Sequence, residues 1–269
     1  MAVMNPGDSG TDPPSSDRVK SADRAILVLE HLAALEKRQS LSVLHRELGI
    51  PKSSLHGVLR TLLGRGWVET DESGTLFGLG VRALLVGTTY IDADDVVSRC
   101  RETMDLLSRE SGETIHLGRF DRAEIVYLAT RQSSHYLRTI SRVGRRLPVH
   151  ATAMGKAILS TYPPDQLQQV VSQRLASLTA NTITDLEDLQ ADLEATRERG
   201  YAVDNEENTL GLTCFAVALP LQTPAKDAIS ISVPVARLRP DSRRVELADL
   251  LLEVVGSMQP RWGMRDPAI

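Results

Sequence analysis

Residues 40–68 read SLSVLHRELGIPKSSLHGVLRTLLGRGWV, and this stretch decides the fold of the N-terminal part of the chain. Ser40 is a favoured helix N-cap and Gly49 a favoured helix end, so a short helix is expected between them. Pro51 suits the first turn of a second helix, because the N–H that it lacks would be unpaired there. The second helix has apolar residues at the i, i+3, i+4, i+7, i+8 spacing of a buried face: Leu55, Val58, Leu59, Leu62 and Leu63. The two helices and their short connection predict a helix-turn-helix.

The residues that follow favour a winged helix over an αα-hairpin inside some other helical protein. Residues 67–68 and 75–79 read as two short strands around a turn at residues 71–74, which is the pattern of a wing. Between residues 41 and 66 there are four Lys and Arg residues and one Glu, although the whole chain has a net charge of −4. Basic and hydroxyl groups on the exposed face of the second helix would reach phosphates and base edges of DNA. The predicted DNA-binding residues are Arg46, Lys52, Ser53, Ser54, His56 and Arg60.

The composition predicts a cytoplasmic protein. The chain has 269 residues, two cysteines and an acidic balance of charge, so we expect neither a disulfide framework nor a protein that coats nucleic acid through bulk positive charge. It opens with no cationic and apolar leader, and no apolar run approaches the roughly 20 residues that cross a bilayer. Residues 1–20 hold almost no large apolar side chains, and we expect them to form a disordered tail.

The periodicity of the remaining chain predicts an α+β domain. Helices are expected at residues 23–36, 80–92, 92–112, 155–161, 163–175, 185–199 and 241–258. Strands are expected as a hairpin within residues 113–130 and at residues 201–204, 214–221 and 228–235. An antiparallel sheet with helices at its edges and faces accounts for this order. The predicted division is a tail at 1–20, a winged helix-turn-helix at 21–80, a linker helix at 81–95 and an α+β domain at 96–262.

Four segments resemble the IclR family of bacterial transcription regulators. They are LGIPKSSLHGVLRTLLGRGWV (48–68), LPVHATAMGKAIL (147–159), GYAVDNEENTLGLTCFAVAL (200–219) and DAISISVP (227–234). The resemblance implies an N-terminal winged helix, a linker helix and a GAF-like effector-binding domain, assembled as a homodimer or as a tetramer built from two dimers. It also implies a regulator whose binding to a double-stranded DNA operator is controlled by a small organic effector, such as a small carboxylate or an aromatic acid.

The second helix of the helix-turn-helix departs from the family pattern at Gly57. Family members usually carry an Arg directly after the His, as in VHRLL, whereas Gly57 follows His56 here. This change removes a DNA contact and costs about 1 kcal/mol of helix propensity. The wing also lacks Lys and Arg. Both departures support an alternative, in which the chain is a small-molecule enzyme or a non-DNA sensor whose winged helix contacts another protein.

The stretch GYAVDNEENTLGLTCFAVAL raises the question of catalysis. An enzyme would need a base for Cys214, yet the six histidines are scattered and none repeats at metal-ligand spacing near it. We therefore expect no enzyme activity, no metal and no cofactor. Glu206 and Glu207 are expected in a polar loop that faces solvent, whereas Asp204 and Cys214 are expected in the wall of a ligand pocket.

The resemblance assigns this pocket to three segments. Residues 151–155 open a helix whose free N–H groups and positive dipole end suit a small anion, although His150 and Ala157 break the phosphate-loop pattern. Two serines share one face of an alternating strand, which faces either the pocket or solvent. The predicted effector-binding residues are Thr152, Ala153, Met154, Gly155, Asp204, Cys214, Ser230 and Ser232. An effector with a carboxylate and a hydroxyl or amine would suit both the helix end and the Asp204 carboxylate.

Overall fold

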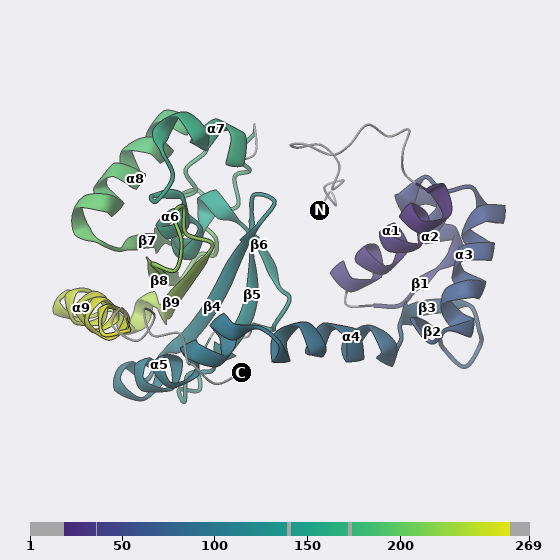
Figure 1. Cartoon of the computed structure of the whole chain (residues 1–269), viewed down its shortest axis with the longest axis horizontal. Coiled ribbons are helices and arrows are strands. Elements are labelled where there is room, and N and C mark those ends of the chain that lie inside the picture. Colours follow the sequence, from purple (N-terminus) through teal and green to yellow (C-terminus); the bar gives the residue numbers. More distant parts are fainter. Residues whose placement is uncertain (1–18, 36, 139–140, 172–173, 259–269) are drawn as a thin grey trace, which may run out of the picture. The chain divides into compact units, whose positions relative to one another are not determined.

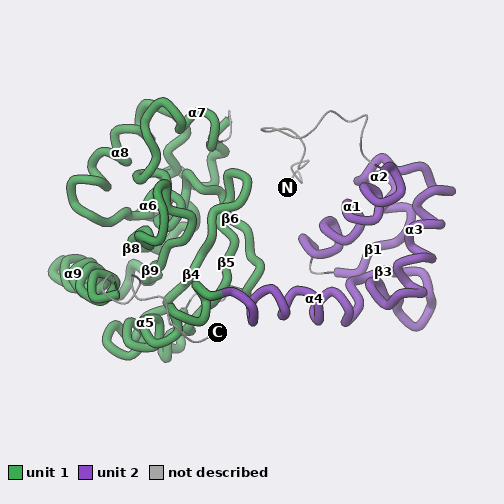
Figure 2. Tube along the Cα trace, viewed as in Figure 1, with its two compact units in different colours: residues 1–10, 95–269 green, residues 11–94 purple. Residues whose placement is uncertain are grey.

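The computed structural model describes residues 19–35, 37–138, 141–171 and 174–258, which divide into two compact units (Figure 2). One unit ends at Asp94 and the other begins at Asp95. The predicted disordered tail lies outside the described residues except for Val19 and Lys20, and Lys20 already belongs to the first helix.

The N-terminal unit is a winged helix followed by one further helix (Figure 1). Its elements are α1 (Lys20–Ala34), β1 (Gln39–Ser40), α2 (Leu41–Leu48), α3 (Lys52–Gly64), β2 (Val68–Thr70), β3 (Leu76–Leu79) and α4 (Val81–Asp92). The three strands form an antiparallel sheet in the order β1-β3-β2. Leu44 of α2 and Leu55 of α3 are fully buried in one core with Val28 of α1. The predicted winged helix-turn-helix is confirmed.

Short-range contacts fix the ends of these elements. The Ser40 side chain accepts a hydrogen bond from the Val43 N–H at 3.4 Å and caps α2. Gly49 ends α2 with φ of 66°, in the left-handed region that glycine tolerates best. In the wing, Asp71 Oδ1 accepts hydrogen bonds from the N–H groups of Thr75 and Leu76 at 3.0 and 2.9 Å. The turn residues identified in the sequence therefore act as expected.

The C-terminal unit contains a six-stranded antiparallel sheet of order β6-β5-β4-β9-β8-β7. Its strands are β4 (Thr114–Asp121), β5 (Glu124–Arg131), β6 (Arg146–Pro148), β7 (Ala202–Asn205), β8 (Leu212–Ala218) and β9 (Asp227–Pro234). Its α-helices are α5 (Asp95–Ser111), α6 (Ala153–Leu159), α7 (Leu167–Val170), α8 (Leu186–Arg199) and α9 (Ser242–Gly256), and its 3-10 turns are η1 (Val149–Ala151), η2 (Pro164–Gln166) and η3 (Val235–Arg237).

Helices cover both faces of this sheet, with α6, α7 and α8 on one side and α5 and α9 on the other (Figure 1). Successive residues of a strand point to opposite faces. In β9 the branched residues Ile229 and Ile231 are fully buried, while Ser230 and Ser232 alternate with them and are turned toward α6. The predicted α+β class is confirmed.

Three elements differ from the sequence prediction. The single helix predicted at residues 163–175 is wrong, because the structure has η2 and a four-residue α7, and Val171 is extended. Val170 and Val171 are β-branched and lower the helix propensity at this point. The strands β1 and β6 were not predicted, since two or three residues are too few to show an alternating pattern.

Candidate functional site

A small cavity lies on the α6 face of the sheet. Its walls come from strands β5, β6, β7, β8 and β9, from the start of α6, and from the segments that precede β6 and follow β7. The cavity has a volume of about 20 Å³. Since a water molecule needs roughly 10–15 Å³ by this measure, an organic ligand would have to displace part of the wall.

Seven of the eight predicted effector-binding residues line this cavity. They are Thr152, Ala153, Met154, Asp204, Cys214, Ser230 and Ser232. The eighth, Gly155, is not in the lining. A Cβ at Gly155 would lie 1.9 Å from the Val149 carbonyl oxygen, so only glycine allows α6 to approach η1 this closely. Gly155 therefore shapes the wall without facing the cavity.

The start of α6 is less open to an anion than the sequence suggests. Thr152 Oγ1 accepts a hydrogen bond from the Gly155 N–H at 3.1 Å, which uses one of the donors expected to be free. The helix spans only seven residues. The prediction that a set of free N–H groups lies here is wrong for Gly155, and the helix end alone offers an anion little.

Strand register brings three predicted cavity residues side by side. Asp204 of β7 pairs with Cys214 of β8, and Cys214 pairs with Ser232 of β9. Residues paired directly across adjacent strands point to the same face. The Cys214 Sγ atom lies 3.2 Å from Ser232 Oγ. A carboxyl, a thiol and a hydroxyl therefore form one continuous polar strip in the wall of the cavity.

The two titratable groups of this strip are both deeply buried. Asp204 Oδ1 accepts hydrogen bonds from the backbone N–H groups of Glu207 at 2.7 Å and Asn208 at 3.2 Å. Burial outweighs these bonds and, with the charge of Glu207, raises the pKa of Asp204 from 3.8 to about 7. Burial and the neighbouring Asp204 also raise the pKa of the Cys214 thiol well above its ordinary value. A thiol that stays protonated is a poor nucleophile, so this cysteine suits binding better than catalysis.

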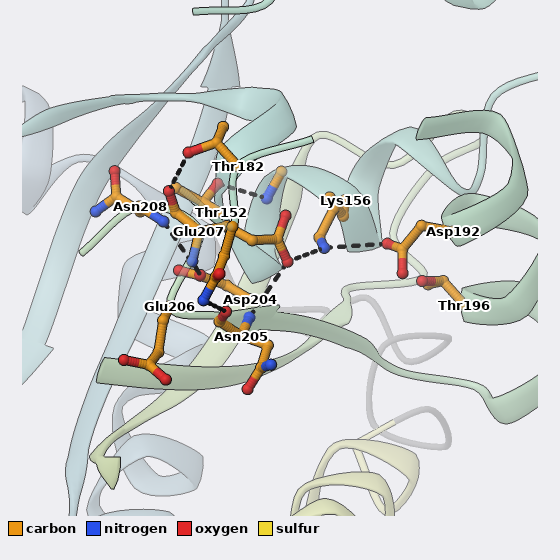
Figure 3. Close-up of polar contacts among 12 residues, drawn as sticks. Thr152, Lys156, Thr182, Asp192, Thr196, Asp204, Asn205, Glu206, Glu207 and Asn208 are labelled. Carbon is orange, nitrogen blue, oxygen red and sulfur yellow. Dashed lines mark hydrogen bonds and ion pairs between the residues drawn. The ribbon is translucent and has the colours of Figure 1, made fainter. Parts of the chain in front are cut away.

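A buried ion pair holds the loop that follows Asp204 (Figure 3). Lys156 Nζ of α6 lies 2.6 Å from Glu207 Oε1 and 3.1 Å from Asp192 Oδ2 of α8. Lys156 is 1% exposed and Glu207 is 5% exposed. The prediction that Glu207 faces solvent is wrong, because the sequence gives no sign that a buried lysine compensates its charge. Glu206 is half-buried and accepts a hydrogen bond from the Gly211 N–H at 2.7 Å.

Six residues of the cavity were not predicted from the sequence. They are Tyr127, Arg145, Leu147, Asn208, Thr209 and Leu212. Arg145 lies in a basic part of the sequence, since residues 125–164 contain six Lys and Arg residues and no Asp or Glu.

Tyr127 stacks on His116 with ring centroids 4.5 Å apart. Burial and the charge of Arg145 lower the pKa of His116 to about 3, so this histidine is neutral.

The second candidate site is the exposed face of α3. Lys52, Ser53, His56 and Arg60 are exposed there, while Leu55, Leu59 and Leu62 of the opposite face are buried. In the part of the chain that the structure describes, these four polar side chains have no hydrogen bond or ion pair. Donors without an intramolecular partner are free to contact phosphates and base edges.

The other two predicted DNA-binding residues contact protein groups. Ser54 is half-buried, and its Oγ accepts a hydrogen bond from Arg24 Nη1 of α1 at 2.6 Å. Arg46 lies 3.0 Å from Glu47 Oε1 but keeps 69% of its side chain exposed. Arg24 was not predicted, because nothing in the sequence connects it with a residue 30 positions away on another helix.

Other kinds of site find no support in the described residues. No three or more His, Cys, Asp and Glu side chains among them are grouped so that they could hold a metal ion. None of the helices in the described part of the chain is long and apolar enough to span a membrane.

Both units match models of known protein families. Residues 21–72 match the IclR helix-turn-helix domain, and residues 88–258 match the C-terminal domain of the bacterial transcriptional regulator IclR. The second match alone covers more than half of the chain. The chain belongs to the IclR family. As an IclR-family regulator it combines a DNA-binding winged helix with a C-terminal ligand-binding domain.

Named relatives of this IclR-family chain are regulators and repressors of transcription. It is 33% identical to the glycerol operon regulatory protein of Streptomyces coelicolor, over 82% of this chain and 87% of that protein. It is 32% identical to the repressor AllR of Klebsiella pneumoniae, over 99% of this chain and 98% of that protein. A crystal structure is known of an IclR homologue from Microbacterium hydrocarbonoxydans in complex with 4-hydroxybenzoate. It covers 90% of this chain and 99% of its own chain, with a TM-score of 0.74. At 21% sequence identity, this match shows that the two proteins share a fold. None of these names indicates a catalytic function.

Proposed function

We propose that the winged helix binds a DNA operator in the cytoplasm and that a small organic effector, bound in the cavity of the C-terminal unit, controls this binding. The observation that carries the proposal is the cavity itself, where buried Asp204, Cys214, Ser230 and Ser232 converge beside the start of α6. Polar groups that converge in one pocket are typical of a small-molecule site.

A small carboxylate or aromatic acid fits this cavity best. Hydroxyl groups of Thr152, Ser230 and Ser232 can donate to carboxylate oxygens, and Arg145 supplies a positive charge in the same lining. The homologue from Microbacterium hydrocarbonoxydans was crystallised with an aromatic acid, which agrees with this class of ligand.

The size of the cavity supplies a physical reason for control. Since about 20 Å³ holds little more than one water molecule, an effector binds only a conformation in which the wall has moved. Part of that wall, Asn208 and Thr209, belongs to the loop that the Lys156–Glu207 ion pair connects to α6. A ligand that binds one conformation more tightly than another shifts the equilibrium between them.

We further propose that the regulator acts as a homodimer or as a tetramer of two dimers, in which each pair of winged helices binds two operator half-sites. Two-fold symmetric proteins of this class bind half-sites about one helical turn apart. In this proposal Lys52, His56 and Arg60 contact one half-site from α3, where their side chains are exposed, and Arg46 of α2 contacts phosphate.

Fluorescence anisotropy tests the DNA side of this proposal. The full chain is titrated against a labelled duplex from the promoter next to its own gene and against a random duplex of equal length. We expect tighter binding to the promoter, and a slope of about −5 for log K against log[salt] if a dimer neutralises about six phosphates. Equal affinity for the two duplexes at moderate salt would refute operator binding.

A further inference from the structure

One cation lines the cavity. Arg145 precedes β6 and is half-exposed, and it is the only Lys or Arg among the described residues of the lining. Its backbone is fixed, because its carbonyl accepts a hydrogen bond from the Tyr127 N–H at 2.9 Å and its N–H donates to the Arg142 carbonyl at 3.2 Å. No described residue forms a hydrogen bond or ion pair with its guanidinium. Arg145 is therefore held at the cavity with its charge uncompensated by any described group.

One carboxyl lines the same cavity from the opposite edge of the sheet. Asp204 lies in β7, an edge strand, whereas Arg145 directly precedes β6, the strand at the opposite edge. The two do not form an ion pair. Arg145 is also not among the groups that perturb the pKa of Asp204, whereas Glu207 and Lys156 are. The cavity therefore has a positive pole, the Arg145 guanidinium, and an acidic pole, the Asp204 carboxyl, which do not form an ion pair with each other.

We propose that Arg145 binds the anionic group of the effector and that Asp204 accepts a hydrogen bond from a hydroxyl or ammonium group at the other end of the same molecule. This inference rests on the proposed function, in which the cavity is the effector site. It assigns the effector to the short hydroxy acids and amino acids, and it makes Arg145, rather than the capped start of α6, the residue that selects for a carboxylate.

The chemistry of the two side chains supports these roles. A guanidinium presents two parallel N–H donors to a carboxylate, which gives both affinity and orientation. Asp204 uses Oδ1 for two backbone N–H groups. Its carboxyl can accept a further hydrogen bond from a ligand donor, whereas a ligand carboxylate placed beside it would be repelled once it ionises.

Between the poles, the lining suits a short spacer. Met154 and the Tyr127 ring are apolar, and Ser230 and Ser232 can accept or donate according to the ligand. Other basic residues of this part of the chain, Arg131, Arg146 and Lys156, form ion pairs with carboxylates, so Arg145 itself supplies the positive charge on its side of the cavity.

Calorimetry with matched ligands tests the assignment on the full chain. The panel consists of short hydroxy acids and amino acids, each with the acid that lacks the donor and the alcohol that lacks the acid. One set is 3-hydroxybutyrate, butyrate and 1,3-butanediol, and another is 4-hydroxybenzoate, benzoate and 4-hydroxybenzyl alcohol. For a set that binds, we expect the molecule with both groups to have a Kd at least about tenfold lower than either analogue.

Two variants then assign each pole. Arg145→Gln should abolish the preference for the hydroxy acid over the alcohol, and Asp204→Ala, which leaves no side-chain hydrogen-bonding group, should abolish the preference for the hydroxy acid over the plain acid. Each variant is measured with each ligand of a set, as in a double-mutant cycle, so that the loss of a direct contact can be distinguished from a general loss of stability. Arg146→Gln is the matched control, because Arg146 is the next residue, pairs with Asp121 and Glu124 at the surface and does not line the cavity. Its Kd values should stay within about twofold of the unaltered protein.

The outcomes distinguish this inference from the function on which it rests. Ligands that bind and change operator affinity, but bind Arg145→Gln as tightly as the unaltered protein, would overturn the assignment and leave the proposed function intact. A plain acid that binds as tightly as its hydroxy acid would do the same. No saturable binding across the panel, or binding that leaves operator affinity unchanged, would overturn both.

Discussion

Replacing Asp204 with Asn should change the pH dependence of stability in a defined direction. The pKa of Asp204 is about 7 in the folded protein and about 3.8 when unfolded, so the folded state disfavours the ionised carboxylate. Stability is therefore lost as pH rises through this range. Each tenfold change in proton affinity is worth about 1.4 kcal/mol, so the full penalty is roughly 4 kcal/mol. Roughly 2–3 kcal/mol of it develops between pH 5 and pH 8.

The assay is urea unfolding of the full chain and of Asp204→Asn at several pH values, without ligand. Asn keeps an Oδ1 acceptor for the Glu207 and Asn208 N–H groups, so the comparison isolates the charge. The free energy of unfolding of the variant, relative to the unaltered protein, should rise by roughly 2–3 kcal/mol from pH 5 to pH 8. Asp165→Asn, which alters an exposed carboxylate, should show little change. A relative stability of Asp204→Asn that is flat or falls with pH would refute the burial argument.

Three further predictions concern single contacts. Lys156→Met should lower the free energy of unfolding by about 3–5 kcal/mol because it leaves the Glu207 carboxylate buried and unpaired, and adding Glu207→Met should recover much of this loss in the same urea assay. Arg60→Ala should weaken operator binding about tenfold and, if Arg60 contacts phosphate, reduce the salt slope by about 1 in anisotropy titrations. Gly57→Ala should raise stability by about 0.5–1 kcal/mol because its Cβ enters open space on a helix, whereas Gly49→Ala should lower it because φ is 66° there.

The sequence was informative wherever a local pattern determined structure. The apolar stripe of α3, the Ser40 cap and the Gly49 helix end are short-range features, and the structure confirms each of them. Alternation in β9 separates core residues from Ser230 and Ser232 for the same reason. The predicted helix at residues 163–175 was wrong where two β-branched valines and two prolines made the local signal weak.

Contacts between distant segments could not be predicted in this way. Glu207 looked like a solvated loop residue, and only the fold places it 2.6 Å from a lysine 51 residues earlier in the chain. Arg145 was missed because it reaches the cavity from outside the four segments that resemble the family. Its neighbourhood is basic over 40 residues, which a local motif search does not register.

The central claim is that a ligand in the cavity and an operator on the winged helix control each other's binding, and reciprocal titration tests it most directly. The operator Kd is measured with and without a saturating ligand from the panel, and the ligand Kd is measured with and without operator. Linkage requires that both change by the same factor, which is about 5- to 150-fold for typical couplings. We predict equal factors within that range. A ligand that binds in the cavity and leaves the operator Kd unchanged would contradict the account.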